Sequence, residues 1–245
     1  MGSNVVSNGY VTASRLLGRL FSPRIVAFEA RRMPGPETLH AEEARYVARA
    51  VPKRVAEFAA GRACARRALG ELAITEFPLR VGADREPLWP AGITGSITHT
   101  AGFCGVVVAR TTVVRSLGID AERSSAVHRR LWRQIATGEE LRWLEGLPAP
   151  RARIMASVVF SAKESFFKCQ FPLTREWLNF ADVTVHIERR GFRISPLRAL
   201  ALEGLVAAPW AGRYVREDPL IVTGLSLPVR ATAVSNSTHR RTRAS

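Results

Sequence analysis

The chain has 245 residues, of which 47% are hydrophobic, and a formal charge of +15. This charge predicts attraction to a polyanion: a nucleic acid, a phosphorylated cofactor or an acidic protein partner. The three cysteines are scattered and lack metal-ligand spacing, which argues against a disulfide framework or a zinc site. No stretch approaches the ~20 apolar residues of a membrane-spanning helix, so we expect a cytoplasmic protein without membrane contact.

The first half of the chain is expected to span residues 21–117, after a loose leader at 1–20 that ends in a short amphipathic turn and has no assigned role. Alternating residues at 24–32 predict a strand, and the pattern at 37–72 predicts two helices separated at Pro52. In the second helix, Arg54, Arg62 and Arg66 can share one face. That face is either a solvated basic surface or an anion-binding surface.

Residues 77–95 are rich in proline and glycine and predict an irregular loop. Trp89 within the loop either fills the core or offers a surface on which a base can stack. Residues 96–100 and 103–110 then predict a β-hairpin with His99 near its turn.

A further strand is predicted at residues 113–122, where the period of two places Asp120 and Glu122 on the same side. Two carboxylates that face the same way repel each other unless a cation lies between them. Oxygen ligands of this kind suit Mg²⁺.

The second half is expected to span residues 118–235. Polar helical sequence at 123–147 precedes a longer helix at 153–170, which should end before Phe171 and Pro172. Strands are predicted at 181–188, 191–195, 212–216 and 220–227, and the basic tail at 236–245 is predicted to be disordered. The fold class is therefore α+β, with helices followed by antiparallel strands in each half.

The segment FSAKESFFK at residues 160–168 places Glu164 between Lys163 and Lys168 on the longer helix. Lys53 is the only other lysine, whereas arginine is abundant, so the choice of lysine here indicates a specific role. Such a grouping suits a metal-bound phosphate. The alternative is an amphipathic helix with solvated lysines and one ion pair, between Glu164 and Lys168.

Four segments in order, GRACAR (61–66), REPLWPAGITGSITHT (85–100), LGIDAE (117–122) and FSAKESFFKCQFPLT (160–174), resemble the 4′-phosphopantetheinyl transferases. The likeness is to the larger, surfactin-synthetase-activating type and its branch of enterobactin-synthetase component D. It implies a monomer of two pseudo-symmetric halves with coenzyme A between them. The implied reaction moves the phosphopantetheine arm of coenzyme A to a serine of an apo acyl, aryl or peptidyl carrier protein and releases adenosine 3′,5′-bisphosphate.

The resemblance also implies roles for individual residues. Mg²⁺, or Mn²⁺ in its place, would be bound by Asp120, Glu122 and Glu164. The implied catalytic residues are Asp120, Lys163, Glu164 and Lys168, and the implied cofactor-binding residues are Arg54, Arg62, Arg80, Thr98, His99, Lys163 and Lys168. The base that takes the proton of the serine is either Glu164, directly or through a water, or a metal-bound water.

Two other functions compete with this interpretation. The charge and the 33 arginines would also fit a nucleic-acid-binding protein, although paired acids on a strand would repel a phosphate backbone. An inactive homologue that only holds coenzyme A or a carrier protein is the second alternative.

Overall fold

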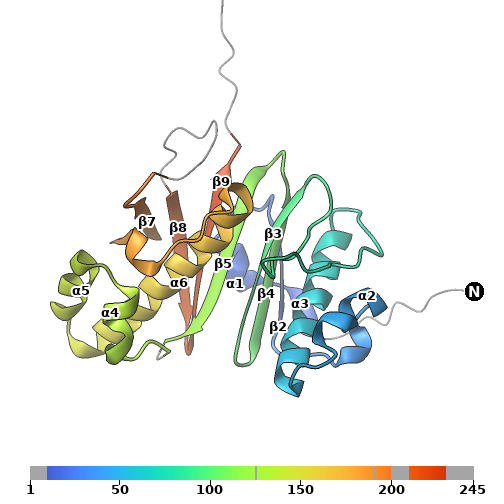
Figure 1. Cartoon of the computed structure of the whole chain (residues 1–245), viewed down its shortest axis with the longest axis horizontal. Helices are drawn as coiled ribbons and strands as arrows, with labels where there is room; N and C mark the ends of the chain where they lie inside the picture. The colour runs from blue at the N-terminus through green and yellow to red at the C-terminus, as the bar shows by residue number, and fades with distance from the viewer. Residues whose placement is uncertain (1–9, 125, 190, 200–209, 230–245) are drawn as a thin grey trace, which may run out of the picture.

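The computed structural model describes residues 10–124, 126–189, 191–199 and 210–229 of the chain. Two antiparallel sheets lie next to each other, and helices cover each of them (Figure 1). This arrangement confirms the predicted α+β class and its two halves. None of the helices in these ranges combines the length and apolar character needed to cross a bilayer.

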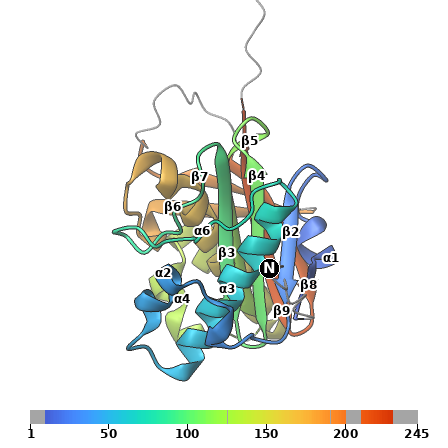
Figure 2. The same cartoon turned by 90° about the vertical axis from the view of Figure 1, so that its right-hand side faces the viewer.

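The first sheet has the order β1-β2-β4-β3. Its strands are β1 (Val11–Ala13), β2 (Val26–Ala30), β4 (Phe103–Arg110) and β3 (Ile93–Thr100). Strand β4 is almost wholly apolar because it is buried on both faces: Val106 and Val108 join one core cluster, while Phe103 and Val107 join another. Helix α3 (Pro52–Gly70) covers the first of these faces, as seen in Figure 2.

The segment predicted to be a loose leader has regular structure from residue 11 onward, so that part of the prediction is wrong, whereas the short amphipathic turn predicted at its end agrees with a short helix. Strand β1 pairs with β2, and the short helix α1 (Arg15–Gly18) follows it. Leu16, Leu17 and Leu20 are buried in the core cluster that contains Phe103. Residues 1–9 and the predicted tail at 236–245 lie outside the described residues.

The second sheet has the order β5-β9-β8-β7-β6. Its strands are β5 (Val114–Arg123), β9 (Leu220–Pro228), β8 (Trp210–Glu217), β7 (Gly191–Pro196) and β6 (Val183–Glu188). All four strands predicted after the long helix are therefore present. Helix α6 (Ala149–Thr174) crosses this sheet and packs on β5 and β9 (Figure 1).

Helix α6 is longer at both ends than the sequence predicted. Pro150 lies in its first turn, where a proline costs no hydrogen bond, and Pro172 lies in its last turn. The helix continues to Thr174 because Phe171 is buried and stacks on Phe167, with ring centroids 5.2 Å apart. The burial of Phe171 and its stacking on Phe167, one turn earlier in the same helix, thus outweigh the local effect of Pro172.

The remaining helices are short. Instead of one helix between residue 37 and Pro52, there are η1 (Pro36–Thr38), α2 (Ala41–Ala44) and η2 (Arg45–Val47). The polar helical stretch after β5 forms η3 (Arg129–Leu131), α4 (Trp132–Ile135) and α5 (Gly138–Glu145), and η4 (Phe180–Asp182) follows α6.

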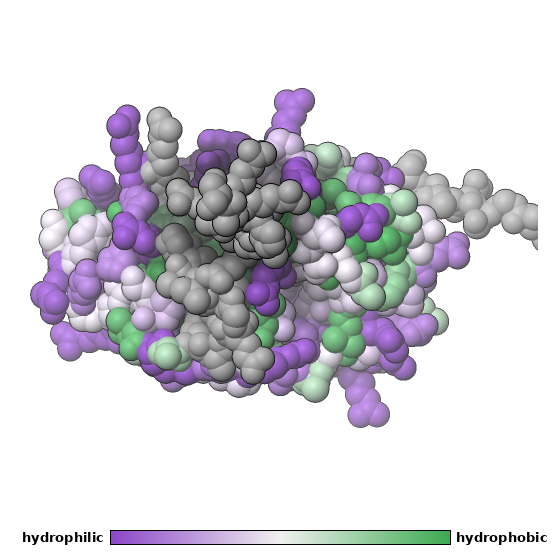
Figure 3. All heavy atoms as spheres, turned by 90° about the horizontal axis from the view of Figure 1, so that it is seen from above, coloured by the Kyte–Doolittle hydropathy of each residue, from purple (hydrophilic) through white to green (hydrophobic). Residues whose placement is uncertain are grey.

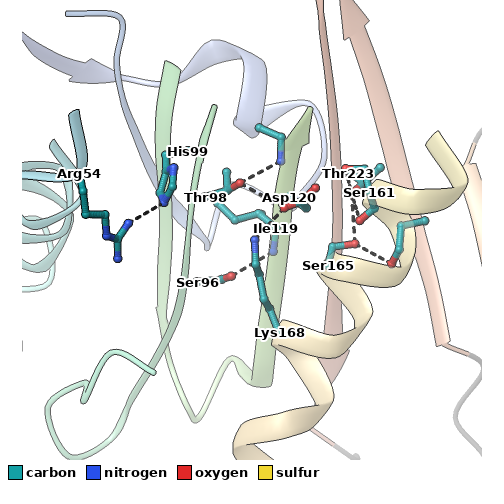
Figure 4. Close-up of polar contacts among 12 residues, drawn as sticks. Arg54, Ser96, Thr98, His99, Ile119, Asp120, Ser161, Ser165, Lys168 and Thr223 are labelled. Carbon is teal, nitrogen blue, oxygen red and sulfur yellow. Dashed lines mark hydrogen bonds and ion pairs between the residues drawn. The ribbon is translucent and has the colours of Figure 1, made fainter. Parts of the chain in front are cut away.

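The two sheets meet where β3 lies beside β5. The backbone N–H of Ile119 donates to Ser96 Oγ at 3.1 Å, and that of Ala121 donates to Thr98 Oγ1 at 2.9 Å (Figure 4). Side-chain hydroxyls on β3 therefore satisfy backbone donors of β5 at the junction. This junction brings the polar residues of β3 close to the carboxylates of β5.

Candidate functional site

A cavity of about 590 Å³ lies between the two halves. Helix α3, strand β3 and the loop that includes Trp89 line it from the first half, and the last turns of α6 line it from the second. Figure 3 shows the molecule from above: where described residues are visible on this face, hydrophilic side chains predominate and hydrophobic ones form smaller patches between them. A ligand in this cavity would touch both halves at once.

Three cationic or imidazole side chains line the α3 side of the cavity: Arg54, Arg62 and His99. Arg54 Nη1 lies 3.0 Å from His99 Nε2 (Figure 4). Burial is the main cause that lowers the pKa of His99, so its imidazole is neutral near pH 7 and Nε2 can accept this hydrogen bond. The Arg54 guanidinium is half exposed, which leaves donors for an anion.

Arg62 is more deeply placed than Arg54. Its Nε donates to the backbone oxygen of Leu79 at 3.1 Å, and its guanidinium lies 3.9 Å from the centre of the Phe58 ring. Burial is the main cause that lowers its pKa to about 10, so it still carries its charge at pH 7. Arg62 therefore offers a fixed positive charge in the cavity wall.

The carboxylate of Asp120 lies at the meeting point of β3, β5 and α6. Its Oδ1 accepts hydrogen bonds from Lys168 Nζ at 2.7 Å and from Thr98 Oγ1 at 3.4 Å (Figure 4). Its Oδ2 is buried and has no hydrogen-bond partner. An unpartnered buried carboxylate oxygen is costly and marks a position where a cation or a donor from a ligand would be stabilised.

Glu122 and Glu164 lie close enough to Asp120 for their charges to interact. Burial, followed by the charge of Asp120, raises the pKa of Glu122 to about 7. Burial also raises the pKa of Glu164, and Asp120 adds to the increase while Lys168 opposes it. The three predicted metal-binding residues thus share one electrostatic environment, although they come from two elements distant in sequence.

The donor set suits a divalent cation but is not gathered into a complete site. Among the described residues, no three side chains of the metal-binding types come together closely enough to hold an ion. The chemistry nevertheless fits Mg²⁺, because three carboxylates supply hard oxygen donors and one of those oxygens, Asp120 Oδ2, is buried without a partner.

Thr98 does not have the role that the sequence suggested. Its side chain is 2% exposed, and its hydroxyl accepts from Ala121 and donates to Asp120. The prediction that Thr98 contacts a phosphate is therefore corrected: this hydroxyl joins β3 to β5 and orients Asp120.

Lys163 also requires a correction. Although it precedes Glu164, its Nζ is buried and donates to Glu140 Oε2 at 2.7 Å, and to the backbone oxygens of Ile135 and Phe180 at 2.9 and 2.7 Å. These three acceptors use all the donors of an ammonium group. Lys163 therefore ties α6 to its neighbours, and its predicted contact with a pyrophosphate disagrees with this placement.

Glu140, the partner of Lys163, was missed as an important residue. It also accepts from the backbone N–H of Val185 at 2.6 Å and of Thr137 at 2.6 Å. The sequence did carry a signal, because Thr137 and Glu140 have the spacing of a capping box, which orients the glutamate at N3 back toward the start of its helix.

Three residues of the loop before β3, Arg80, Glu86 and Trp89, differ in their relation to the cavity. Arg80 is exposed and is not among the described residues that line the cavity, so its predicted cofactor contact is not supported by its position. Trp89 is half-buried; it packs against the core and also lines the cavity. Arg175 Nη1, at the end of α6, contacts Glu86 Oε1 at 2.5 Å and so links this loop to the second half, which the sequence did not indicate.

A smaller cavity of about 250 Å³ lies next to Glu164. Phe166, Phe167, Trp177 and Leu178 supply most of its apolar lining. Phe167 and Trp177 also line the larger cavity, so the two hollows share these side chains.

Comparison with known proteins agrees with this architecture. Residues 42–109 match the model of the 4′-phosphopantetheinyl transferase N-terminal domain, and residues 116–202 match that of the 4′-phosphopantetheinyl transferase superfamily. The gap between the two matches falls at the turn from β4 to β5, which connects the two sheets. The chain therefore belongs to the 4′-phosphopantetheinyl transferase superfamily and is a transferase that acts on carrier proteins.

Individual relatives support the same assignment. The chain is 38% identical to the 4′-phosphopantetheinyl transferase Svp of Streptomyces mobaraensis, over 81% of this chain and 82% of that protein. It is 37% identical to PptT of Mycobacterium tuberculosis, over 76% and 85% of the two chains. Enterobactin synthase component D of Salmonella typhi is 39% identical over 47% of this chain and 48% of its own length. This membership favours the transferase over a nucleic-acid-binding protein.

Proposed function

We propose that coenzyme A is the donor, that a divalent cation, Mg²⁺ or Mn²⁺, is required, and that adenosine 3′,5′-bisphosphate is the second product. The observation that carries the proposal is the unpartnered Oδ2 of Asp120, next to Lys168 and two acids of raised pKa, at the edge of an arginine-lined cavity. Pyrophosphate and phosphate groups are ligands for such a combination of charges.

The nucleotide end of coenzyme A would occupy the larger cavity. Arg54 and Arg62 supply positive charge for its phosphates, and His99 is hydrogen-bonded to Arg54 on the same wall. The uncharged pantetheine arm would lie in the smaller cavity, whose aromatic and leucine side chains suit it. The pyrophosphate, which joins the two ends, then falls between the cavities, near Lys168 and Glu164.

In the proposed reaction, the hydroxyl oxygen of the carrier serine attacks the phosphorus that bears the pantetheine arm. The new oxygen–phosphorus bond forms as the bond to the bridging oxygen breaks, and the bridging oxygen leaves with the adenosine bisphosphate. Either Glu164, which borders both the acids and the smaller cavity, or a water bound to the cation would take the proton of the serine, because a carboxylate that binds the cation is a weaker base.

Lys168 is positioned to stabilise the charge that grows on the departing oxygen. Its ammonium lies 2.7 Å from Asp120 Oδ1, and its side chain is 30% exposed toward the cavity that it lines. The cation, bound by Asp120, Glu122 and Glu164, would supply further charge neutralisation at the pyrophosphate.

All the residues proposed for the site come from one chain, so we propose that the monomer is the working unit. The three cysteines are all free and buried, which supports a reducing compartment such as the cytoplasm. The carrier protein can be of the acyl, aryl or peptidyl type.

The test is incubation of the chain with an apo carrier protein, coenzyme A and Mg²⁺, followed by mass spectrometry of the carrier. A mass gain of one phosphopantetheine arm is expected, together with stoichiometric adenosine 3′,5′-bisphosphate, and both should disappear with a metal chelator. Asp120→Asn should abolish transfer while the fold is kept. Full turnover by this variant across a Mg²⁺ titration would show that the ion site is assigned wrongly.

A further inference from the structure

Helix α6 touches the backbone of β5 at one glycine, Gly118. A Cβ atom built on Gly118 would lie 1.8 Å from the backbone oxygen of Ser165. It would also lie 2.9 Å from the backbone nitrogen and from the Cβ of Cys169. Two of these three neighbours are backbone atoms of the helix, which cannot rotate away as a flexible side chain would.

The contact lies between the two sets of residues that form the proposed site. Gly118 is two residues before Asp120 and four before Glu122, so all three face the same side of β5. On the helix, Ser165 directly follows Glu164, and Cys169 directly follows Lys168. The separation of helix and strand at Gly118 therefore governs the separation of the acids on β5 from Glu164 and Lys168.

Hydrogen bonds hold α6 against the sheet on either side of this contact. Ser116 Oγ on β5 donates to the backbone oxygen of Cys169 at 2.6 Å. On β9, Thr223 Oγ1 lies 2.8 Å from the backbone oxygen of Ser161 and 3.1 Å from Ser165 Oγ (Figure 4). The helix is thus fixed at the closest approach that a residue without a side chain allows.

We propose that Gly118 is a positioning residue that sets the distance between the carboxylates of β5 and the Glu164–Lys168 pair of α6. The inference rests on the proposed function. Because Cβ atoms do not come within 3.0 Å of such neighbours, any side chain at residue 118 would push the Ser165 oxygen outward by more than 1 Å. A displacement of 1 Å at a catalytic site can cost about 10²-fold in rate.

The first test is the steady-state kinetics of Gly118→Ala with one apo carrier protein. The expected result is a kcat reduced by about 10²-fold with the KM for coenzyme A within about twofold of the wild type, since most of the larger cavity is built by the other half. A wild-type kcat would overturn the inference. Absence of transfer by the wild-type chain would instead refute the proposed function.

Gly191→Ala is the matched control. A Cβ on Gly191, in β7, would lie 2.2 Å from the backbone oxygen of Gly212 in β8, so it creates the same kind of backbone clash at the far side of the sheet. This control should lower Tm but keep the wild-type kcat when assayed well below its Tm. An equal loss of kcat in both variants would mean that general destabilisation is responsible, and would overturn the inference.

A double-mutant cycle with Lys168→Ala separates positioning from a merely structural role. If Gly118→Ala acts by moving Lys168 and Glu164 away from Asp120, the loss of the lysine should cost much less in the alanine background than in the wild type. If the kcat losses of the two single variants simply multiply in the double variant, this would count against the positioning role of Gly118. If Gly118→Ala does not fold, Cys169→Val adds bulk at the same contact, and an unchanged kcat in that variant would equally overturn the inference.

Discussion

Replacing Lys163 by methionine would show that the two lysines flanking Glu164 have different tasks. The side chains of Lys163 and Glu140 are each 1% exposed, so the substitution leaves a buried carboxylate without its partner. Removing one partner of a buried ion pair costs about 3–5 kcal/mol. In a domain of this size that corresponds to a Tm lower by about 6–20 °C. Turnover per folded molecule should stay within about twofold, because Lys163 faces Glu140 and two backbone oxygens.

Thermal unfolding followed by circular dichroism, with kinetics at 20 °C, measures both effects. In the double variant Lys163→Met, Glu140→Gln, part of the lost stability should return, since the uncompensated charge is removed, although the amide keeps only one of the two oxygens that accept backbone N–H groups. Lys168→Met is the matched comparison: its turnover should fall by about 10²-fold or more, because its ammonium adjoins Asp120 and the cavity. If Lys163→Met kept its Tm but lost its turnover, Lys163 would be meeting the substrate, and the interpretation of its buried contacts would be wrong.

Three further predictions concern the cavity and the acids. Arg54→Ala should weaken coenzyme A binding by about 1–3 kcal/mol in calorimetry with little change in Tm. Arg62→Ala should lower both the affinity for coenzyme A and the Tm, because Arg62 is buried against Phe58. The pKa of Glu122 is raised from 4.5 to about 7, so without a cation this group stabilises the fold below pH 4.5 and its contribution is lost as the pH rises through 7. Mg²⁺ should therefore raise Tm more at pH 8 than at pH 5.5, and Glu122→Gln should remove that difference. Glu86→Gln should speed coenzyme A dissociation a few-fold in stopped-flow measurements, because it removes the ion pair with Arg175 across the cavity. The stability cost should be under about 1 kcal/mol. An unchanged dissociation rate would show that this ion pair does not retain the ligand.

Local sequence patterns were sufficient for the elements that carry the acids. The hairpin of β3 and β4 lies where the two strand-like runs indicated, although β3 begins at Ile93, within the stretch predicted to be a loop. The period of two places Asp120 and Glu122 on one side of β5. Glu164 could be linked to these acids because the spacing of the motifs resembled a known family. The resemblance, rather than the composition, identified that combination.

Contacts distant in sequence could not be predicted in the same way. Lys163 and Lys168 are five residues apart, so they lie on different sides of α6. The sequence alone does not reveal that Glu140 contacts Lys163 and that Asp120 contacts Lys168. Likewise, Thr98 was expected at a phosphate because the resemblance to a known family implied it. Alternation along β3 instead directs its hydroxyl to the strand of the other half.

The early segment, which was predicted to be a loose leader without an assigned role, decides where this chain can be trimmed for expression. Leu16, Leu17 and Leu20 are at most 5% exposed and pack behind the junction of the two sheets, in the cluster that holds Leu117 and Ile119 of β5. Burying one leucine contributes about 1.5–3 kcal/mol, so the three together approach the whole stability of a typical domain, about 5–15 kcal/mol. A chain begun at residue 21 to remove an apparent leader would uncover the back of the strand that carries Asp120, and its inactivity would be mistaken for a defect of chemistry.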